Sequence, residues 1–517
     1  MTSFYEKLNN TDKMIDEKED AQSRANVDKW IFRLLLVLIG AMPLIVLANV
    51  EEVVSPLISN VDVLSSGTKG DLFTHYKVLF VVVITVITGA MLLVKFFFMN
   101  GQIRKTPINY IIGLFAFAII LSTILSPNIT IALEGQFNRS DGAVTWLCYL
   151  ALMFIAMNIE YPKNVVNYIM CTMTPFVLVN LSIITMNFYG KDLLQYGWVQ
   201  KLVSIALPEG ASISEGSQLL GTLNQWNYMS GMFAMMTLMY LTYTLLSKNK
   251  LYKFMALFIA IVSVAITLMS LSTNGFFTIV CITPFIIWIA IRSKDLKQNI
   301  ASLLIFIVCT GGLIHILASH NEKVWSESVG FFLSGDNPYA EIISESMNTS
   351  LLGDVVSANS SEFELPVLPE GKWGAGTGRV YIWKETIKLA EDRPFLGYGL
   401  DSLPYHFPHY QLEARGNLLE VTIVDKPHNI YVGILFGVGG VGFILFMLFI
   451  LYTLKNIFKE ILFVNSKVTT LAVVWLSFLV QSLFNDTTPA IVGVLFIIMG
   501  IIQSIHLSKE QKMSLSH

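Results

Sequence analysis

Long apolar runs alternate with short polar connections along almost the whole chain of 517 residues. A helix needs about 20 predominantly apolar residues to cross a bilayer. About twelve segments approach or exceed that length, and they lie at 31–48, 77–99, 108–125, 143–158, 165–188, 226–246, 251–271, 275–292, 300–318, 430–454, 468–485 and 488–507. The pattern predicts an all-α polytopic membrane protein with about twelve transmembrane helices.

Basic residues mark one side of the predicted bundle. Lysines and arginines gather before the first span, in alternate connections and after the last span. Because cytoplasmic loops carry an excess of these residues, we expect both termini to be cytoplasmic. The predicted organisation is a cytoplasmic tail (1–30), nine spans (31–318), an extracytoplasmic loop (319–427), three further spans (428–507) and a cytoplasmic tail (508–517).

Composition agrees with the membrane interpretation and excludes several classes of function. Hydrophobic residues make up 54% of the chain and charged residues only 14%, against about 25% charged in soluble proteins. No basic tract supports nucleic-acid binding. The cysteines lie far apart inside predicted spans, so we expect neither disulfides nor a metal site from them. Motifs for metal or nucleotide binding are also missing from the sequence, and we expect no metal and no cofactor.

The predicted long loop ends in an amphipathic segment. Its apolar positions recur at helical spacing, at Val380, Trp383, Ile387 and Ala390. Thr377 can cap the start of this helix, and Pro394 stops it. A helix with one apolar side is suited to lie on the membrane surface. The loop therefore places an interfacial helix between the ninth and tenth predicted spans.

Two residues of this region have the chemistry of an anion site and of a general base. Arg379 falls at the start of the predicted helix, where free N–H groups favour an anion, and its guanidinium can bind two phosphate oxygens. His428 follows Pro427 at the start of the next span. A positive helix end disfavours imidazolium, so we expect a neutral ring that accepts a proton. The structural alternatives are a loop-capping arginine and a histidine bonded to a nearby carbonyl.

Four motifs in this part of the chain resemble those of one family. They are G-R-x-x-x-W at 378–383, RPFLGYG at 393–399, P-H-N-x-Y at 427–431 and GVGGVGF at 437–443. Their order and their position against the spans are similar to the O-antigen ligase/O-antigen polymerase family. The resemblance is strongest over about 374–449 and weaker upstream.

The resemblance implies a bacterial glycosyltransferase of the cytoplasmic (inner) membrane whose active face is extracytoplasmic. Its substrates would be an undecaprenyl-diphosphate-linked glycan and an acceptor glycan or glycolipid, with membrane lipid around it. His428 matches the histidine regarded as the catalytic base, and Asn429 would orient this ring or the sugar. We expect His428 and Arg379 to be catalytic, without a metal.

Further substrate-binding candidates lie outside this pair. Arg139, in the polar NRSDG stretch before the fourth span, either holds a diphosphate oxygen or anchors a lipid headgroup with Asp141 as partner. Asn274 stands where many relatives carry an arginine. Arg393, Arg415 or Lys426 could supply that missing cation, and we count Arg393 among the binding residues.

The other polar residues of the outer face receive structural interpretations. His406 and His409 are expected to shape the loop, and Asp486 to be a residue of the outer turn between the last two spans. Asp401 and Asp425 either orient a histidine or are solvated. All of them lie on the predicted outer side.

Three functions remain open at this point. A lipid-linked glycan polymerase or ligase is favoured, and of these two the polymerase. A polysaccharide flippase would need charged residues within the spans, which are almost free of charge. A non-catalytic membrane scaffold or sensor leaves the cation-rich loop unexplained.

Overall fold

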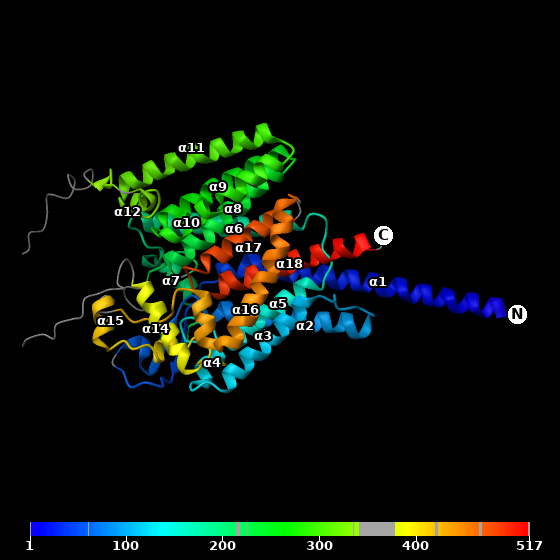
Figure 1. Ribbon diagram of the computed structural model, residues 1–517, viewed down its shortest axis with the longest axis horizontal. Coiled ribbons are helices and arrows are strands. Elements are labelled where there is room, and N and C mark those ends of the chain that lie inside the picture. Colours follow the sequence, from blue (N-terminus) through cyan, green and yellow to red (C-terminus); the bar gives the residue numbers. More distant parts are fainter. Residues whose placement is uncertain are drawn as a thin grey trace, which may run out of the picture.

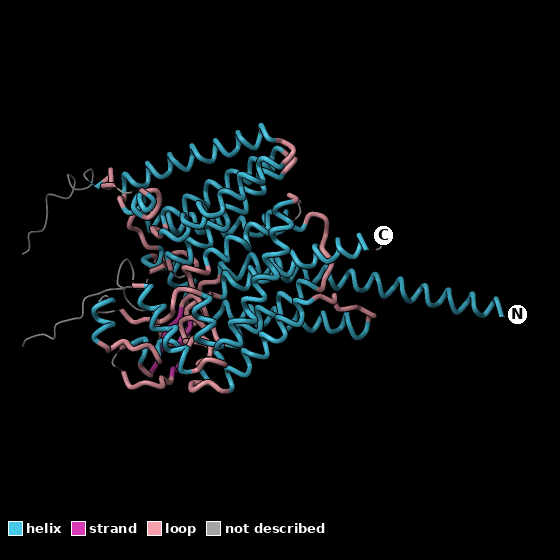
Figure 2. Tube along the Cα trace, viewed as in Figure 1, coloured by secondary structure: helices cyan, strands magenta, loops and turns pink. Residues whose placement is uncertain are grey.

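The computed structural model describes residues 2–59, 61–213, 218–223, 225–333, 335–340, 378–418, 422–464 and 468–514. Helices run roughly side by side along an elongated bundle, with both chain ends toward one end of it (Figure 1). Both strands and much of the loop structure gather toward the opposite end (Figure 2). The predicted cap at Thr377 lies outside the described residues.

Every predicted span coincides with a helix. Nine helices in the described part of the chain are long and apolar enough to cross a membrane: α2 (His75–Phe98), α3 (Pro107–Ile124), α6 (Val165–Phe188), α8 (Trp226–Leu246), α9 (Lys250–Met269), α10 (Thr273–Arg292), α11 (Leu296–His320), α16 (Ile430–Leu462) and α18 (Pro489–Ser514). Two shorter apolar helices, α5 (Ala143–Met157) and α17 (Thr469–Gln481), cover two further predicted spans. The all-α multi-pass architecture is confirmed, whereas the count of twelve crossings and their orientation stay predictions.

The first predicted span occupies the end of a much longer helix. Helix α1 (Thr2–Ala41) runs without interruption from the polar N-terminal segment into the apolar segment. Its apolar part packs against α2 and α6. The polar tail and the first span therefore form one continuous helical rod (Figure 1).

Burial separates central helices from lipid-facing ones. Helices α8 and α18 are enclosed by their neighbours over 89% of their apolar windows, whereas α11 is enclosed over only 22%. Helix α8 packs against α9, α10 and α17, and α18 packs against α5. The exposed apolar residues of α11, such as Val308, fit a helix that faces lipid hydrocarbon.

Short elements cover the end of the bundle away from the termini. They are β1 (Asn49–Val53), β2 (Gly67–Asp71), α4 (Ile129–Glu134), α7 (Gly197–Val203), α12 (Lys323–Ser326), α14 (Arg379–Asp392) and α15 (Leu412–Asn417). The two strands form an antiparallel hairpin that the sequence pattern did not reveal. The carboxylate of Asp71 then accepts hydrogen bonds from the backbone N–H groups of Thr74 (2.8 Å) and His75 (2.7 Å), which starts α2.

Helix α14 confirms the predicted amphipathic helix but buries a different face. Tyr381 and Ile382 are buried in a small apolar cluster with residues that include Phe407. Of the predicted apolar face, Val380 is 46% exposed and Ile387 is 42% exposed. The helix thus has two apolar faces, one packed on the protein and one left exposed as expected for a helix at a membrane surface.

Helix α16 is interrupted where the glycine-rich motif begins. Gly439 has φ 73° and ψ −175°, far from helical values. Residues 394–399, hereafter the strap, fill the interruption: Tyr398 N–H donates to Phe436 O (3.0 Å) and Gly440 N–H donates to Pro394 O (2.7 Å). A Cβ atom at Gly439 would lie 2.4 Å from the Phe395 carbonyl carbon, so glycine is required.

The strap supplies partners to backbone groups that the broken helix leaves unpaired. Two further bonds, from Gly399 N–H to Gly437 O (2.9 Å) and from Val441 N–H to Phe395 O (3.3 Å), complete the set. Unpaired backbone groups are costly at membrane depth. The RPFLGYG and GVGGVGF motifs therefore form one structural unit, and this unit carries the start of α16.

Candidate functional site

An imidazole and a carboxylate from distant parts of the chain meet at the N-terminal end of α16. His428 Nδ1 lies 2.6 Å from Asp486 Oδ2. His428 precedes α16, and Asp486 lies in the turn between α17 and α18. The backbone N–H of Ile430 donates to Ser482 O (2.9 Å), which ties the two segments together.

His428 adopts a backbone conformation that non-glycine residues rarely occupy. Its φ is 52°, in the left-handed region. Such residues persist where the surrounding structure holds them, and they occur often at functional sites. The strained turn directs the imidazole toward Asp486, while Asn429 caps α16 by accepting from the N–H groups of Tyr431 (3.0 Å) and Val432 (3.2 Å).

The pKa of His428 is shifted in the opposite direction from the one expected from the helix end. Burial lowers the pKa of His428, but the charge of Asp486 and the hydrogen bond to it raise it, and the net pKa lies above its ordinary value. Burial also disfavours the charged form of Asp486 and so raises its pKa, but the charge of His428 and the hydrogen bond to it bring the net pKa below its ordinary value. The expected lowering of the pKa of His428 by the helix end is therefore outweighed by the nearby carboxylate, and Asp486, which does lie in the predicted turn, is also the partner of this histidine.

This pairing defines which nitrogen is available for chemistry. A carboxylate on Nδ1 favours the tautomer that carries its proton there, which leaves the lone pair of Nε2 free. When Nε2 takes up a proton, the same carboxylate stabilises the imidazolium. The side chain of His428 is 29% exposed and that of Asp486 only 4%. The dyad thus combines a partly exposed imidazole with a buried carboxylate.

Arg379 lies in the electrostatic field of this dyad. Burial lowers the pKa of its guanidinium, and the negative charges of Asp486 and Glu327 act against that effect. Its positive charge in turn lowers the pKa of His428. Among the described residues, no hydrogen bond or ion pair engages its side chain. A half-buried guanidinium without a carboxylate partner in that part of the chain is suited to bind an anion.

Arg139 instead belongs to a closed ionic cluster. Its Nε lies 3.1 Å from Asp401 Oδ1, and its other nitrogens bind Asp425 and the side-chain oxygen of Gln136. Arg139 is only 9% exposed. The sequence had offered a diphosphate or a headgroup with Asp141 as its partner, but its donors are directed to Asp401 and Asp425.

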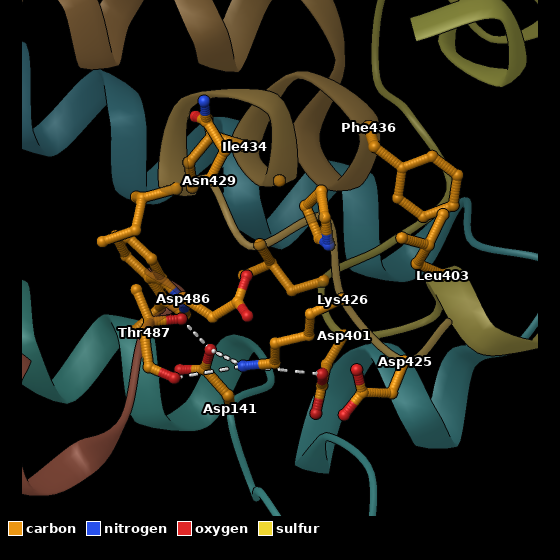
Figure 3. Close-up of a pocket in the computed structure, with 15 residues that line it drawn as sticks. Asp141, Asp401, Leu403, Asp425, Lys426, Asn429, Ile434, Phe436, Asp486 and Thr487 are labelled. Atoms are coloured by element: carbon orange, nitrogen blue, oxygen red, sulfur yellow. Dashed lines mark hydrogen bonds and ion pairs between the residues drawn. The ribbon is translucent and has the colours of Figure 1, made fainter. Parts of the chain in front are cut away.

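Lys426 completes this cluster. Its ammonium lies between Asp141 and Asp401, at 2.8 Å and 3.8 Å (Figure 3). It also donates to Thr487 O (3.1 Å), and the Thr487 hydroxyl donates to Asp141. Asp401 and Asp425 pair with cations and not with a histidine of the described residues, and Asp401 is not solvated either, because its side chain is fully buried. We refer to Arg139, Lys426 and their carboxylates Asp141, Asp401 and Asp425 as the closed cluster.

A cavity of about 50 Å³ lies beside the closed cluster, with Asp486 in its wall. A second one, of about 40 Å³, shares Asp425 and Thr487 with it and is also lined by Lys77 and Arg139. Each has room for very few water-sized groups. These volumes fit internal hydration of charges more than the binding of a sugar.

Asn274 supports the turn that carries Asp486. Its amide donates to Asn485 Oδ1 (2.9 Å), and Gln481 Nε2 donates to Asn274 O (2.8 Å). Of the cations that could replace the missing arginine, Lys426 contacts the same turn through Thr487 O. Uncharged amides, among them Asn274, Gln481 and Asn485, thus brace this turn.

Arg393 and the loop histidines have local partners. Arg393 donates to Leu125 O (3.0 Å) and stacks over the ring of Tyr398 at 5.4 Å. His406 Nε2 lies 3.2 Å from the amide of Asn128, and His409 Nε2 donates to Pro404 O (3.1 Å). These contacts fit the loop-shaping interpretation of the histidines, and they attach Arg393 to the strap region and not to His428.

Sequence reasoning missed Asp486 as the partner of His428. One signal was present: an acidic residue between two long apolar segments, where an isolated charge is costly. The spacing of 58 residues between the two members cannot be read as a contact from a single sequence. The ion pairs of Arg139, with partners more than 260 residues away, were hidden for the same reason.

Comparison with known proteins adds one finding. Residues 258–447 match the family model described as O-antigen ligase. No curated protein matches the chain. The matched stretch contains Asn274, Arg379 and His428, whereas Arg139 and Asp486 lie outside it. The predicted resemblance is thus confirmed over this part of the chain, which is similar to the O-antigen ligase family of membrane proteins that process glycans.

Proposed function

We propose that this protein is a membrane glycosyltransferase that moves a glycan from undecaprenyl diphosphate onto a sugar hydroxyl outside the cytoplasmic membrane. The observation that carries the proposal is the His428–Asp486 dyad in the field of Arg379. A base with one free nitrogen and a cation without a carboxylate partner among the described residues are what a transfer from an anionic leaving group requires.

The first role belongs to the dyad. Nε2 of His428 removes the proton of the acceptor hydroxyl as this oxygen attacks the anomeric carbon of the donor. The new C–O bond forms while the bond from that carbon to the diphosphate oxygen breaks. The proton remains on the imidazolium, which Asp486 stabilises, and is later released to solvent. General base catalysis of this kind typically contributes about 10²–10⁴-fold to the rate.

The second role belongs to Arg379. Negative charge builds up on the departing undecaprenyl diphosphate, and a guanidinium can donate to two phosphate oxygens at once. Such bonds to charged groups contribute about 1.5–3 kcal/mol each. No metal takes part in this scheme.

The closed cluster and the neighbouring amides have positioning roles in this scheme. Lys426 and Asp425 directly precede the Pro427–His428 turn, so their ion pairs hold the turn in place. Asn429 fixes the start of α16, and Asn274 braces the turn of Asp486. Arg139 then acts through the fold and not on the diphosphate.

We favour a polymerase over a ligase, in which the acceptor is another lipid-linked repeat unit. Purified protein in liposomes, given only a synthetic undecaprenyl-diphosphate glycan, should then build chains of several units. A ligase would leave this donor unchanged until a different acceptor glycan is added. Movement of the lipid-linked glycan across the bilayer without bond formation would instead identify a transporter.

The base is tested with His428→Ala in the same liposomes. We expect the transfer rate to fall about 10²–10⁴-fold, because no neighbouring group replaces Nε2. His315→Ala, which removes an exposed histidine of α11, is the matched control and should keep the wild-type rate. Wild-type product length from His428→Ala at equal protein amount would exclude the proposed mechanism.

A further inference from the structure

A further cavity, with polar and apolar walls, lies far from His428 in the sequence and in the bundle. It has a volume of about 420 Å³ and is formed by α1, the α5–α6 connection and the start of α6. These segments lie on the side of the bundle toward the chain termini, whereas α14 lies toward the opposite end (Figure 1). Nothing in the transfer mechanism uses this cavity.

Two cations of the cavity wall have no acidic partner in the described part of the chain. Lys29 and Arg33 lie one helical turn apart on α1, and both are exposed. No ion pair or hydrogen bond engages either side chain among the described residues, and Arg33 rests over the ring of Trp30 at 4.6 Å. The pair is therefore available to an anion.

The buried carboxylate of the wall is already neutralised. Asp28 Oδ1 lies 2.5 Å from Lys95 Nζ, and its Oδ2 accepts from the backbone N–H of Glu160 (3.0 Å). The exposed carboxylate of Glu160 is the remaining negative charge among the lining residues. Two cations against one carboxylate leave a net positive charge at the polar part of the cavity.

The rest of the wall is apolar and aromatic. Phe32 packs edge-on against Tyr161 (5.3 Å between centroids) and Tyr168 (6.0 Å). Leu36 extends this wall one turn further into the predicted span. Tyrosines of this kind are common where a membrane protein meets lipid headgroups. A wall that combines cations with an apolar surface is suited to bind a phosphate group attached to an acyl chain.

We propose that this cavity binds an anionic phospholipid, with its phosphate on Lys29 and Arg33 and an acyl chain along Phe32, Leu36 and Tyr168. Basic pockets between helices at the cytoplasmic side are typical sites for anionic headgroups. The bound lipid would clamp α1 to the α5–α6 connection. The proposal does not depend on the glycosyltransferase assignment.

The test uses full-length protein in nanodiscs of phosphatidylcholine, with or without a fixed fraction of phosphatidylglycerol. We expect phosphatidylglycerol to raise the midpoint of thermal unfolding of the wild type. The double variant Lys29→Ala/Arg33→Ala should lose this increase, and its phosphatidylglycerol affinity by native mass spectrometry should fall about tenfold or more. Its midpoint in pure phosphatidylcholine should equal that of the wild type, which shows that it folds.

The matched control is Lys105→Ala/Lys163→Ala, which removes two exposed cations near the cavity. Neither lysine lines it, although Lys163 follows the lining residue Pro162. This control variant should keep the stabilisation by phosphatidylglycerol. An equal loss in this control would mean a diffuse electrostatic effect and would overturn the site. The same stabilisation by phosphatidylethanolamine, or by inorganic phosphate without anionic lipid, would overturn it as well.

Discussion

Two groups of charges lie close together at the end of the bundle away from the chain termini, and they differ in how they are neutralised. In the closed cluster, Arg139 and Lys426 are both buried and both bound to carboxylates. Beside it, Arg379 has no such partner among the described residues, and His428 keeps one face accessible. Residues of similar type thus take up different tasks: one group holds the fold, and the other is open to a ligand.

The difference has an energetic meaning. A buried ion pair adds little net stability, but removal of one member leaves an uncompensated charge and is strongly destabilising. A half-buried cation that lacks a partner costs stability in the free protein, and this cost is offset when an anion binds. Stability and activity should therefore respond in opposite ways to substitutions in the two groups.

The largest effect on stability is expected in the closed cluster. Arg139→Ala removes the cation that binds both Asp401 and Asp425 and leaves only the more distant Lys426 near Asp401, and breaking a buried pair costs about 3–5 kcal/mol. The midpoint of thermal unfolding in detergent should fall well below that of the wild type. Arg139→Met combined with Asp401→Asn and Asp425→Asn removes the unpaired charges and should recover part of the loss. An unchanged midpoint for Arg139→Ala would contradict the closed-cluster description.

Arg379→Ala should show the reverse pattern. Loss of charge-assisted bonds to the diphosphate should lower the transfer rate by roughly 10- to 100-fold, while the unfolding midpoint stays at or slightly above the wild-type value. Lys388→Ala removes a cation that is 70% exposed on the same helix and serves as control. If both variants lose activity equally, the effect arises from the general charge of α14.

Asp486→Asn sharpens the comparison through pH. Because the carboxylate raises the pKa of His428, the wild-type rate should fall as the pH drops through a value above the ordinary 6.5 of histidine, where the base becomes protonated. Without the carboxylate the pKa falls, so this acidic limb should move to lower pH. The plateau rate should fall too, because the imidazolium is less stabilised. If the acidic limb of the rate–pH profile of Asp486→Asn stays at the wild-type pH, Asp486 does not set the pKa of the group that acts as base.

Substitution of His406 should give the smallest effect. The pKa shift of His406 has the opposite sign from that of His428. Burial, with a contribution from the charge of Arg393, lowers the pKa of His406 to about 4. Between pH 6.5 and 4 the unfolded chain binds a proton that the folded protein rejects, so stability should decrease as the pH falls. Over this pH range, the midpoint of thermal unfolding of His406→Phe should fall by roughly 2–4 °C less than that of the wild type. Transfer activity near neutral pH should change little.

The helices could be predicted from the sequence because their signal is local. Runs of apolar residues predicted the membrane helices, although only the apolar end of α1 was expected, and α14 was located to within one residue at its start. The hairpin of β1 and β2 was missed because its short polar strands lack an apolar alternation. The exposed face of α14 was also assigned incompletely, since the pattern does not tell which of two apolar faces meets protein.

The chemistry of single residues was less accessible. His428 and Arg379 could be selected by their positions at helix starts, and the structure brings them into one electrostatic environment. The partners could not be selected, because Arg139, Asp401 and Asp425 come together only through the packing of α5, the outer loop and α16. The direction of the pKa shift of His428 was misjudged for the same reason, because it depends on a contact with a residue 58 positions away.

The insertion of the strap into α16 has a consequence for the mobility of the candidate site. Four main-chain bonds join the strap to α16, which begins next to His428, so the two cannot separate without leaving these peptide groups unpaired. The strap and the start of α16 must then move together as one rigid unit. In the proposed polymerase, adaptation to products of different length would then fall to other parts of the surface, while Nε2 of His428 keeps a fixed position relative to α16.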